Sequence, residues 1–125
     1  MKNTIKYAVL GGGSWATAIV KMLSENLSTI YWYMHNERAI EHIQTYKHNP
    51  NYLSSVELHT EKLHLTSDIN QAVAQADYLI FVIPSAFLAD ELKKLSISLS
   101  DKIVFSAIKG IVPQTGQIIR YLRLR

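Results

Sequence analysis

The sequence contains no cysteine among its 125 residues. This absence excludes disulfide bonds, thiolate metal ligands and cysteine nucleophiles together. No apolar run approaches the ~20 residues that a membrane-spanning helix needs, and Met1–Thr4 lead into the first apolar segment without a signal-peptide core. We therefore expect a cytoplasmic protein with no membrane span.

The sequence also lacks a large excess of charge of one sign. It has 13 Lys and Arg residues and 10 Asp and Glu residues, which gives a net charge of +3. The basic residues are spread out except near the end of the chain, so we expect no nucleic-acid partner. The five histidines form no H-x-x-x-H pair or carboxylate-flanked cluster, so we expect no metal site. Asp77 and Glu91 lie on different expected elements and have no partner at acid/base spacing, so each is expected on the solvated surface or as a helix cap.

What the sequence does have is a globular composition, with 48% hydrophobic and 18% charged residues. A chain of this length suits one domain with one core, and we expect residues 1–125 to form it. Three of only five glycines are adjacent, Gly11 to Gly13, between the apolar run Tyr7–Leu10 and a helical pattern. The expected order is strand, tight turn and helix.

The spacing Gly11-x-Gly13-x-x-Ala16 fits the dinucleotide-binding pattern G-x-G-x-x-G/A. In that pattern the first glycine makes the turn, the second lets the backbone approach a pyrophosphate, and the third small residue packs helix against strand. The helix should begin near Ser14, where its first free N–H groups favour an anion. Asn26 is its expected C-cap. Its expected apolar face consists of Trp15, Ala18, Ile19, Met22 and Leu23.

Two other interpretations of this turn remain open. Adjacent glycines also suit a plain loop. The stretch Gly12–Ala16 nearly matches the G-x-S-x-G nucleophile elbow of hydrolases, with Ser14 as the nucleophile. An elbow lies inside a sheet whose earlier strands supply the oxyanion loop, and nothing of that kind fits before Ile5. The dinucleotide interpretation is therefore favoured.

The rest of the chain alternates between strand and helix patterns. This alternation predicts an α/β fold: a Rossmann-type parallel sheet with helices on both faces, right-handed crossovers and ligands at the carboxyl ends of the strands. The expected strands lie at 28–34, 63–65, 77–83 and 102–106, and the expected helices at 37–46, after a cap at Ser67 or Asp68, around Leu88 to Leu95, and within 111–125.

Four turns should meet in one crevice at the carboxyl ends: Gly11 to Trp15, His35-Asn36, Pro84-Ser85 and the turn that contains Lys109. The strand before His35 lacks the acidic residue that binds the ribose 2′-hydroxyl of NAD, which favours NADP(H) but leaves NAD(H) open. The ammonium of Lys109 could meet a cofactor or substrate phosphate as a point charge.

Together these stretches resemble the N-terminal cofactor-binding domain of bacterial NAD(P)-dependent glycerol-3-phosphate dehydrogenases. The resemblance implies that Ser14, Trp15 and His35 contact the cofactor with Asn36 beside them, and that Lys109 touches both cofactor and substrate phosphate. The matching pieces are Gly11-x-Gly13-Ser14-Trp15-Ala16-Thr17-Ala18, the His35 turn, Asn49-Pro50-x-Tyr52-Leu53 before Val56-x-Leu58, Val82-x-Pro84-Ser85 and Lys109-Gly110-Ile111.

The resemblance also implies an oxidoreductase that interconverts dihydroxyacetone phosphate and sn-glycerol 3-phosphate by hydride transfer, for glycerophospholipid synthesis. In that family the catalytic acid/base lysine belongs to a later helical substrate domain, so we expect no catalytic residue in this chain and cofactor binding without turnover. A non-catalytic dinucleotide-sensing or interaction module with the same fold is the alternative. A gene that continues past Arg125 into further helical sequence would exclude this sensing module and favour the oxidoreductase. A homodimer stays open.

Overall fold

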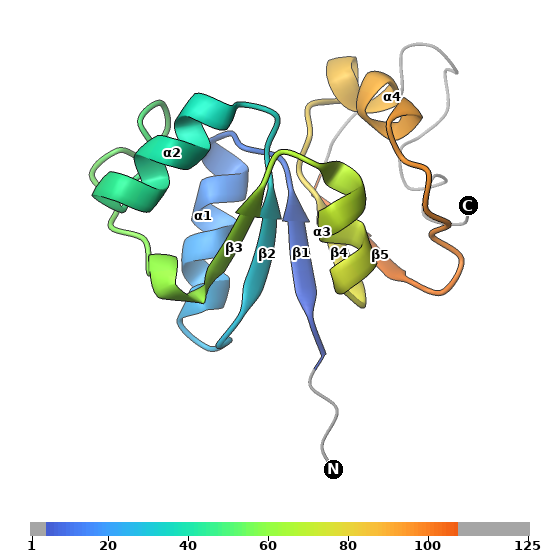
Figure 1. Ribbon diagram of the computed structural model, residues 1–125, viewed down its shortest axis with the longest axis horizontal. Helices are drawn as coiled ribbons and strands as arrows, with labels where there is room; N and C mark the ends of the chain where they lie inside the picture. The colour runs from blue at the N-terminus through green and yellow to red at the C-terminus, as the bar shows by residue number, and fades with distance from the viewer. Residues whose placement is uncertain (1–4, 108–125) are drawn as a thin grey trace.

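The computed structural model describes residues 5–107, which form a five-stranded parallel sheet of order β3-β2-β1-β4-β5 (Figure 1). The expected Rossmann-type α/β fold is confirmed. The first strand lies in the middle, and the chain builds outward from it first to one side and then to the other. The strands are β1 (Tyr7–Leu10), β2 (Ile30–Tyr33), β3 (Leu63–Thr66), β4 (Tyr78–Phe81) and β5 (Ile103–Ser106).

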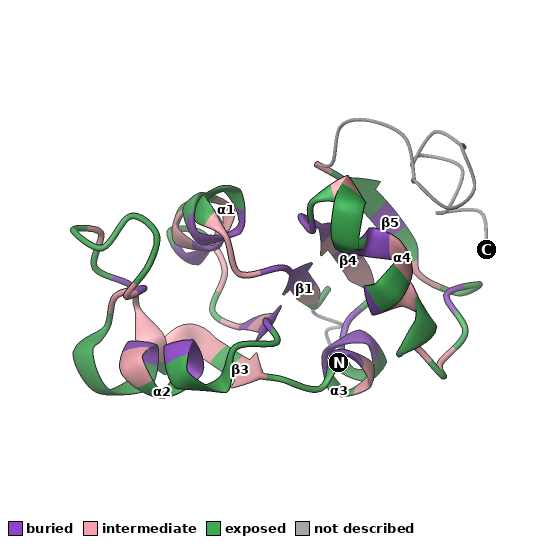
Figure 2. Cartoon of the chain, turned by 90° about the horizontal axis from the view of Figure 1, so that it is seen from above, coloured by how far each residue is buried: buried purple, intermediate pink, exposed green. Residues whose placement is uncertain are grey.

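Helices cover both faces of this sheet, as the view from above shows (Figure 2). They are α1 (Ser14–Ser24), α2 (Glu37–Tyr46), α3 (Ile69–Gln75) and α4 (Ser85–Lys93), with a short 3-10 turn, η1 (Thr60–Lys62). Among residues 5–107, none of these helices has the length and apolar character that crossing a membrane requires.

The core divides into two clusters because successive side chains of a strand point to opposite faces. Val9 of β1 packs with α1 and α2, whereas its neighbours Ala8 and Leu10 pack with α3 and α4. All three side chains are fully buried. Strand β1 is therefore covered on both faces, which holds the turn at its carboxyl end in a fixed place.

Side chains at two strand-to-helix turns cap the helices that follow. The Oδ1 atom of Asn36 accepts a hydrogen bond of 3.1 Å from the backbone N–H of Ala39 at the start of α2. Asp68, one of the two expected caps, accepts one of 3.0 Å from the N–H of Asn70 in α3. Such caps satisfy donors that the first helical turn leaves unpaired.

The expected apolar face of α1 is wrong in part. Trp15 and Met22 are 65% and 62% exposed, and Ala18 is exposed too. Because Ala16 must pack directly against the sheet, the helix is rotated so that its buried residues are Ala16, Thr17, Val20 and Ser24. Ile19 and Leu23, also members of the expected apolar face, do pack against the core and are partly buried. The helix also ends earlier than expected, with Glu25 rather than Asn26 as its C-cap.

Candidate functional site

The site is organised around the glycine turn at the carboxyl end of β1. Gly11 has a φ of +138°, a conformation that residues with a side chain rarely adopt. A Cβ there would lie 2.4 Å from the carbonyl oxygen of Val82, and the Gly11 N–H donates a 2.9 Å hydrogen bond to the carbonyl of Tyr33. The turn is thus wedged between the ends of β4 and β2, and only glycine fits.

The next two glycines differ in what surrounds them. A Cβ at Gly12 would lie 2.8 Å from the Cβ of Met34, so the backbone approaches the end of β2 closely. A Cβ at Gly13 would have nothing within 4 Å. Gly13 therefore faces open space, and the absence of a side chain leaves its backbone accessible to a ligand.

The N-terminus of α1 meets this open space. Gly13 is the N-cap residue and brings no side chain to the free N–H groups of the first turn, which also holds no acidic residue. These groups and the helix dipole favour a negatively charged ligand. The turn, rather than any side chain, therefore supplies the donors for an anion.

Two adjoining cavities lie along the carboxyl edge of the sheet, with volumes of about 540 and 550 Å³. The first extends from the glycine turn over the ends of β2 and β4 to α4, and the second runs past the start of α1. Residues common to both are Gly13, Tyr52, Ile83 and Pro84. The two cavities together form one crevice, hereafter the carboxyl-edge crevice.

This crevice brings together every expected site residue that lies within 5–107. The first cavity is lined by Gly11, Gly13, His35, Asn36 and Pro84, and the second by Gly13, Ser14, Trp15 and Pro84. Lys109, like the expected helix at 111–125, lies outside the described residues. The structure thus joins three of the four expected turns, and Ala107, just before the fourth, lines the second cavity.

The crevice lies where the order of the strands reverses, because β2 continues from β1 to one side and β4 lies on the other. Ligands of open α/β sheets bind at such a point. Among residues 5–107 there is no group of three or more His, Asp or Glu side chains that could hold a metal ion. The free N–H groups at the glycine turn and the start of α1 suit a phosphate-bearing ligand.

A family described as "NAD-dependent glycerol-3-phosphate dehydrogenase N-terminus" matches residues 6–122 of the sequence. The chain belongs to this family. The resemblance found in the sequence is therefore confirmed, and with it the expectation of an oxidoreductase family that uses NAD(P).

Individual relatives agree with this assignment. The chain is 35% identical over 112 residues to the glycerol-3-phosphate dehydrogenase [NAD(P)+] of Ectopseudomonas mendocina, covering 90% of this chain and 33% of the relative. It is 40% identical over 113 residues to that of Tropheryma whipplei, covering 90% and 32%. The chain therefore spans about a third of the length of the curated relatives it matches.

Among solved structures, the fold is shared with glycerol-3-phosphate dehydrogenase from Saccharomyces cerevisiae. The TM-score is 0.83 at 24% identity, and the match covers 97% of this chain and 38% of the yeast chain. At this identity the likeness concerns the fold alone.

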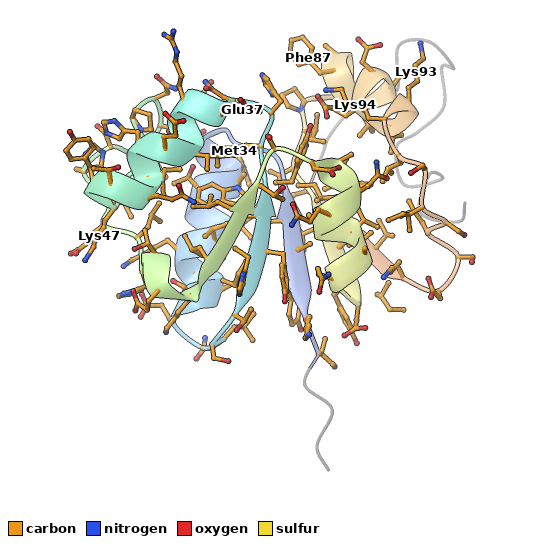
Figure 3. The ribbon with its side chains drawn as sticks, in the orientation of Figure 1. Met34, Glu37, Lys47, Phe87, Lys93 and Lys94 are labelled. Atoms are coloured by element: carbon orange, nitrogen blue, oxygen red, sulfur yellow. The ribbon has the colours of Figure 1, made fainter. Side chains whose placement is uncertain are left out.

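Helix α4 and its C-cap contribute side chains to the crevice that the sequence patterns did not reveal. Phe87 of α4, 60% exposed, and Lys94, the C-cap of α4, line the first cavity together with Met34 at the end of β2. All three residues are labelled in Figure 3. Tyr52, from the loop after α2, lines both cavities. The sequence signal that could have indicated such a role is an aromatic residue, Phe87, two positions after Ser85 at the expected end of a strand.

Glu91 corrects another expectation, because this carboxylate is buried rather than solvated. Its Oε1 accepts a hydrogen bond from the hydroxyl of Tyr33, and its Oε2 lies 3.1 Å from the Nζ of Lys94. Burial raises the pKa of Tyr33 well above its ordinary value, and the hydrogen bond to Glu91 and its charge add to the rise. The pair joins the end of β2 to α4 and closes the floor of the crevice.

Proposed function

We propose that the chain binds NADP(H) or NAD(H) in the carboxyl-edge crevice. The pyrophosphate lies against the turn from Gly11 to Trp15, and the adenosine half extends toward His35 and Asn36. The observation that carries this proposal is the open backbone at Gly13, where a Cβ would meet nothing within 4 Å, at the uncapped N-terminus of α1. Phosphates bind to helix N-termini of this kind without needing a cationic side chain.

The proposed roles follow from where the side chains lie. Ser14 and Trp15 are exposed in the first turn of α1 and line the second cavity, so they meet the ligand beyond the pyrophosphate. Pro84 lines both cavities from the end of β4. By the family resemblance, Lys109 contacts both the cofactor and the phosphate of the substrate.

We infer that NADP(H) is accepted at least as well as NAD(H). The exposed residues at the end of β2 are His35 and Asn36, where an NAD site has a carboxylate for the ribose 2′-hydroxyl. The Asn36 Oδ1 already accepts from Ala39, and the nearby Glu37 Oε2 accepts a hydrogen bond of 3.1 Å from Ser67. Arg38, exposed in the first turn of α2, adds a positive charge that suits a 2′-phosphate.

At the level of the reaction, we propose that the chain supplies the cofactor half of a glycerol-3-phosphate dehydrogenase acting on dihydroxyacetone phosphate and sn-glycerol 3-phosphate. The nicotinamide supplies hydride transfer when bound, and the protein supplies binding and orientation. By the family resemblance the catalytic lysine belongs to the helical substrate domain, so we expect the chain alone to bind cofactor without turnover. A cytoplasmic location belongs to the same proposal, and a homodimer stays open.

The test is made on the purified 125-residue chain. Calorimetric titration with NADPH and NADH is expected to show saturable binding, and no saturation with either would contradict the proposed cofactor role. Mixing the chain with NADPH and dihydroxyacetone phosphate is expected to leave the absorbance of reduced nicotinamide unchanged. Substrate-dependent oxidation would show instead that this chain contains catalytic residues of its own.

A further inference from the structure

Each of the three carbonyl groups in the glycine turn is held by a side chain from a different part of the chain. The donors come from β2, from the loop after α2 and from α1, and all three donor residues are almost completely buried. The bonds are Trp32 Nε1 to Gly11 O at 2.6 Å, Asn49 Nδ2 to Gly12 O at 3.3 Å, and Thr17 Oγ1 to Gly13 O at 2.8 Å.

Holding a carbonyl group also orients the N–H group of the following residue. In a trans peptide the C=O and N–H bonds point in opposite directions, and residues 5–107 contain no cis peptide bond. The N–H groups of Gly12, Gly13 and Ser14 therefore point away from the three buried side chains. None of these N–H groups donates a hydrogen bond to another of the described residues. They remain available to a ligand in the crevice.

Asn49 has the largest share in this arrangement. Besides Gly12, its Nδ2 donates to the hydroxyl of Thr17 at 3.0 Å. Its Oδ1 accepts from the backbone N–H groups of Asn51 at 2.9 Å and Tyr52 at 3.3 Å. Asn51 and Tyr52 line the first cavity, so one buried amide joins the glycine turn to the facing wall of the crevice.

We infer that Asn49, with Thr17 and Trp32, is a positioning residue that orients the peptide groups of the glycine turn toward the pyrophosphate. This inference rests on the dinucleotide binding proposed above. With the peptide groups fixed in advance, a ligand need not order them on binding, and preorganisation of this kind increases affinity. Asn49 itself is buried and does not contact the ligand.

A positioning role and a merely structural role predict different ligand dependence. If Asn49 orients the turn, its loss weakens ligands that carry a pyrophosphate and spares adenosine, which has none. If Asn49 only holds the loop in place, both kinds of ligand weaken together. The two probes are therefore ADP-ribose and adenosine, each titrated against the full chain by NMR.

For Asn49→Ala we expect the dissociation constant of ADP-ribose to rise about tenfold, and that of adenosine to change less than about twofold. Asn26→Ala, at an exposed asparagine outside the crevice, is the matched control and should change neither constant. Equal weakening of both ligands, or no change in either, overturns the inference. Wild-type chain that fails to bind ADP-ribose at all overturns the proposed function, a result that is distinguishable because it precedes any substitution.

A second pair of variants keeps the test decisive if Asn49→Ala does not fold. Thr17→Val keeps the shape of the side chain and removes the hydroxyl that holds Gly13 and accepts from Asn49. Thr17→Ser keeps that hydroxyl. We expect ADP-ribose affinity to fall in Thr17→Val and to be retained in Thr17→Ser, with adenosine affinity similar in both. Equal ADP-ribose affinity in the two variants overturns the inference.

Discussion

The indole Nε1 of Trp32 donates a hydrogen bond of 2.6 Å to the carbonyl oxygen of Gly11. The two residues are 21 positions apart, and the bond joins β2 to the turn that ends β1. Trp32 is fully buried, and its ring packs in the cluster beneath α1 and α2. One side chain thus serves both the hydrophobic core and the backbone of the candidate site.

Trp32→Phe should lower the free energy of unfolding by about 2–4 kcal/mol. The smaller ring leaves a cavity and removes the donor to the buried Gly11 carbonyl. Urea unfolding followed by circular dichroism measures the loss. Trp15→Phe, at a side chain that is 65% exposed, is the control and should cost less than about 0.5 kcal/mol. Equal costs would contradict a stabilising role for the buried Trp32 ring and its hydrogen bond.

Gly11→Ala should destabilise the fold by about 3 kcal/mol or more, because the new methyl group would lie 2.4 Å from the Val82 carbonyl at a φ that alanine avoids. Thermal unfolding of the purified variant measures this. A stable Gly11→Ala chain would mean that the turn and the end of β4 separate easily.

Gly13→Ala should leave stability nearly unchanged and weaken cofactor binding. Gly13 has a φ of −85° and open space around it, so stability should change by less than about 1 kcal/mol. NADPH affinity should nevertheless fall by about tenfold, because the methyl group occupies space that the pyrophosphate needs. Calorimetry on the folded variant tests this, and unchanged affinity would place the ligand away from the turn.

Tyr33→Phe should alter the response of stability to alkaline pH. Because the pKa of Tyr33 is raised on folding, the folded chain keeps this proton while the unfolded chain loses it above its ordinary pKa of 10.0. The contribution is complete below that pH and is lost as pH rises, with a slope of up to about 1.4 kcal/mol per pH unit. Urea unfolding of both chains at increasing pH should show a steeper decline for wild type. Parallel curves would contradict a buried, neutral tyrosine.

The dissociation constant of NADPH should be no larger than that of NADH, since no carboxylate at the end of β2 opposes a 2′-phosphate. Calorimetric titration of the same preparation with both cofactors compares them directly. Arg38→Ala should weaken NADPH selectively if its charge meets the phosphate. NADH binding more than about tenfold tighter than NADPH, a difference of about 1.4 kcal/mol, would contradict the preference.

Local patterns were enough to predict most elements. The expected α2 matches the observed Glu37–Tyr46, and Asp68 caps α3. These succeed because capping and helical periodicity act over a few residues. The apolar face of α1 failed because the close packing of Ala16 on the sheet, a tertiary constraint, decides which side of the helix faces inward.

The candidate site divides in the same way. The residues at the strand ends could be predicted to converge, since the carboxyl ends of parallel strands meet at one edge. The burial of Glu91 could not, because its partner Tyr33 is 58 positions away. Nor could the bonds of Asn49 to the glycine turn, which is 37 positions earlier at Gly12. Such pairs leave no periodic trace in the sequence.

The loop between α2 and η1 closes on itself, because the N–H of Leu58 donates a 2.8 Å hydrogen bond to the carbonyl of Lys47. Its two ends are thereby fixed to each other, and Asn49 secures its first residues. Doubling the length of a flexible loop costs only about 0.6 kcal/mol. A change in the length of the exposed stretch around Ser54 and Ser55 should therefore cost the sheet little stability, because the two ends of the loop stay joined to each other.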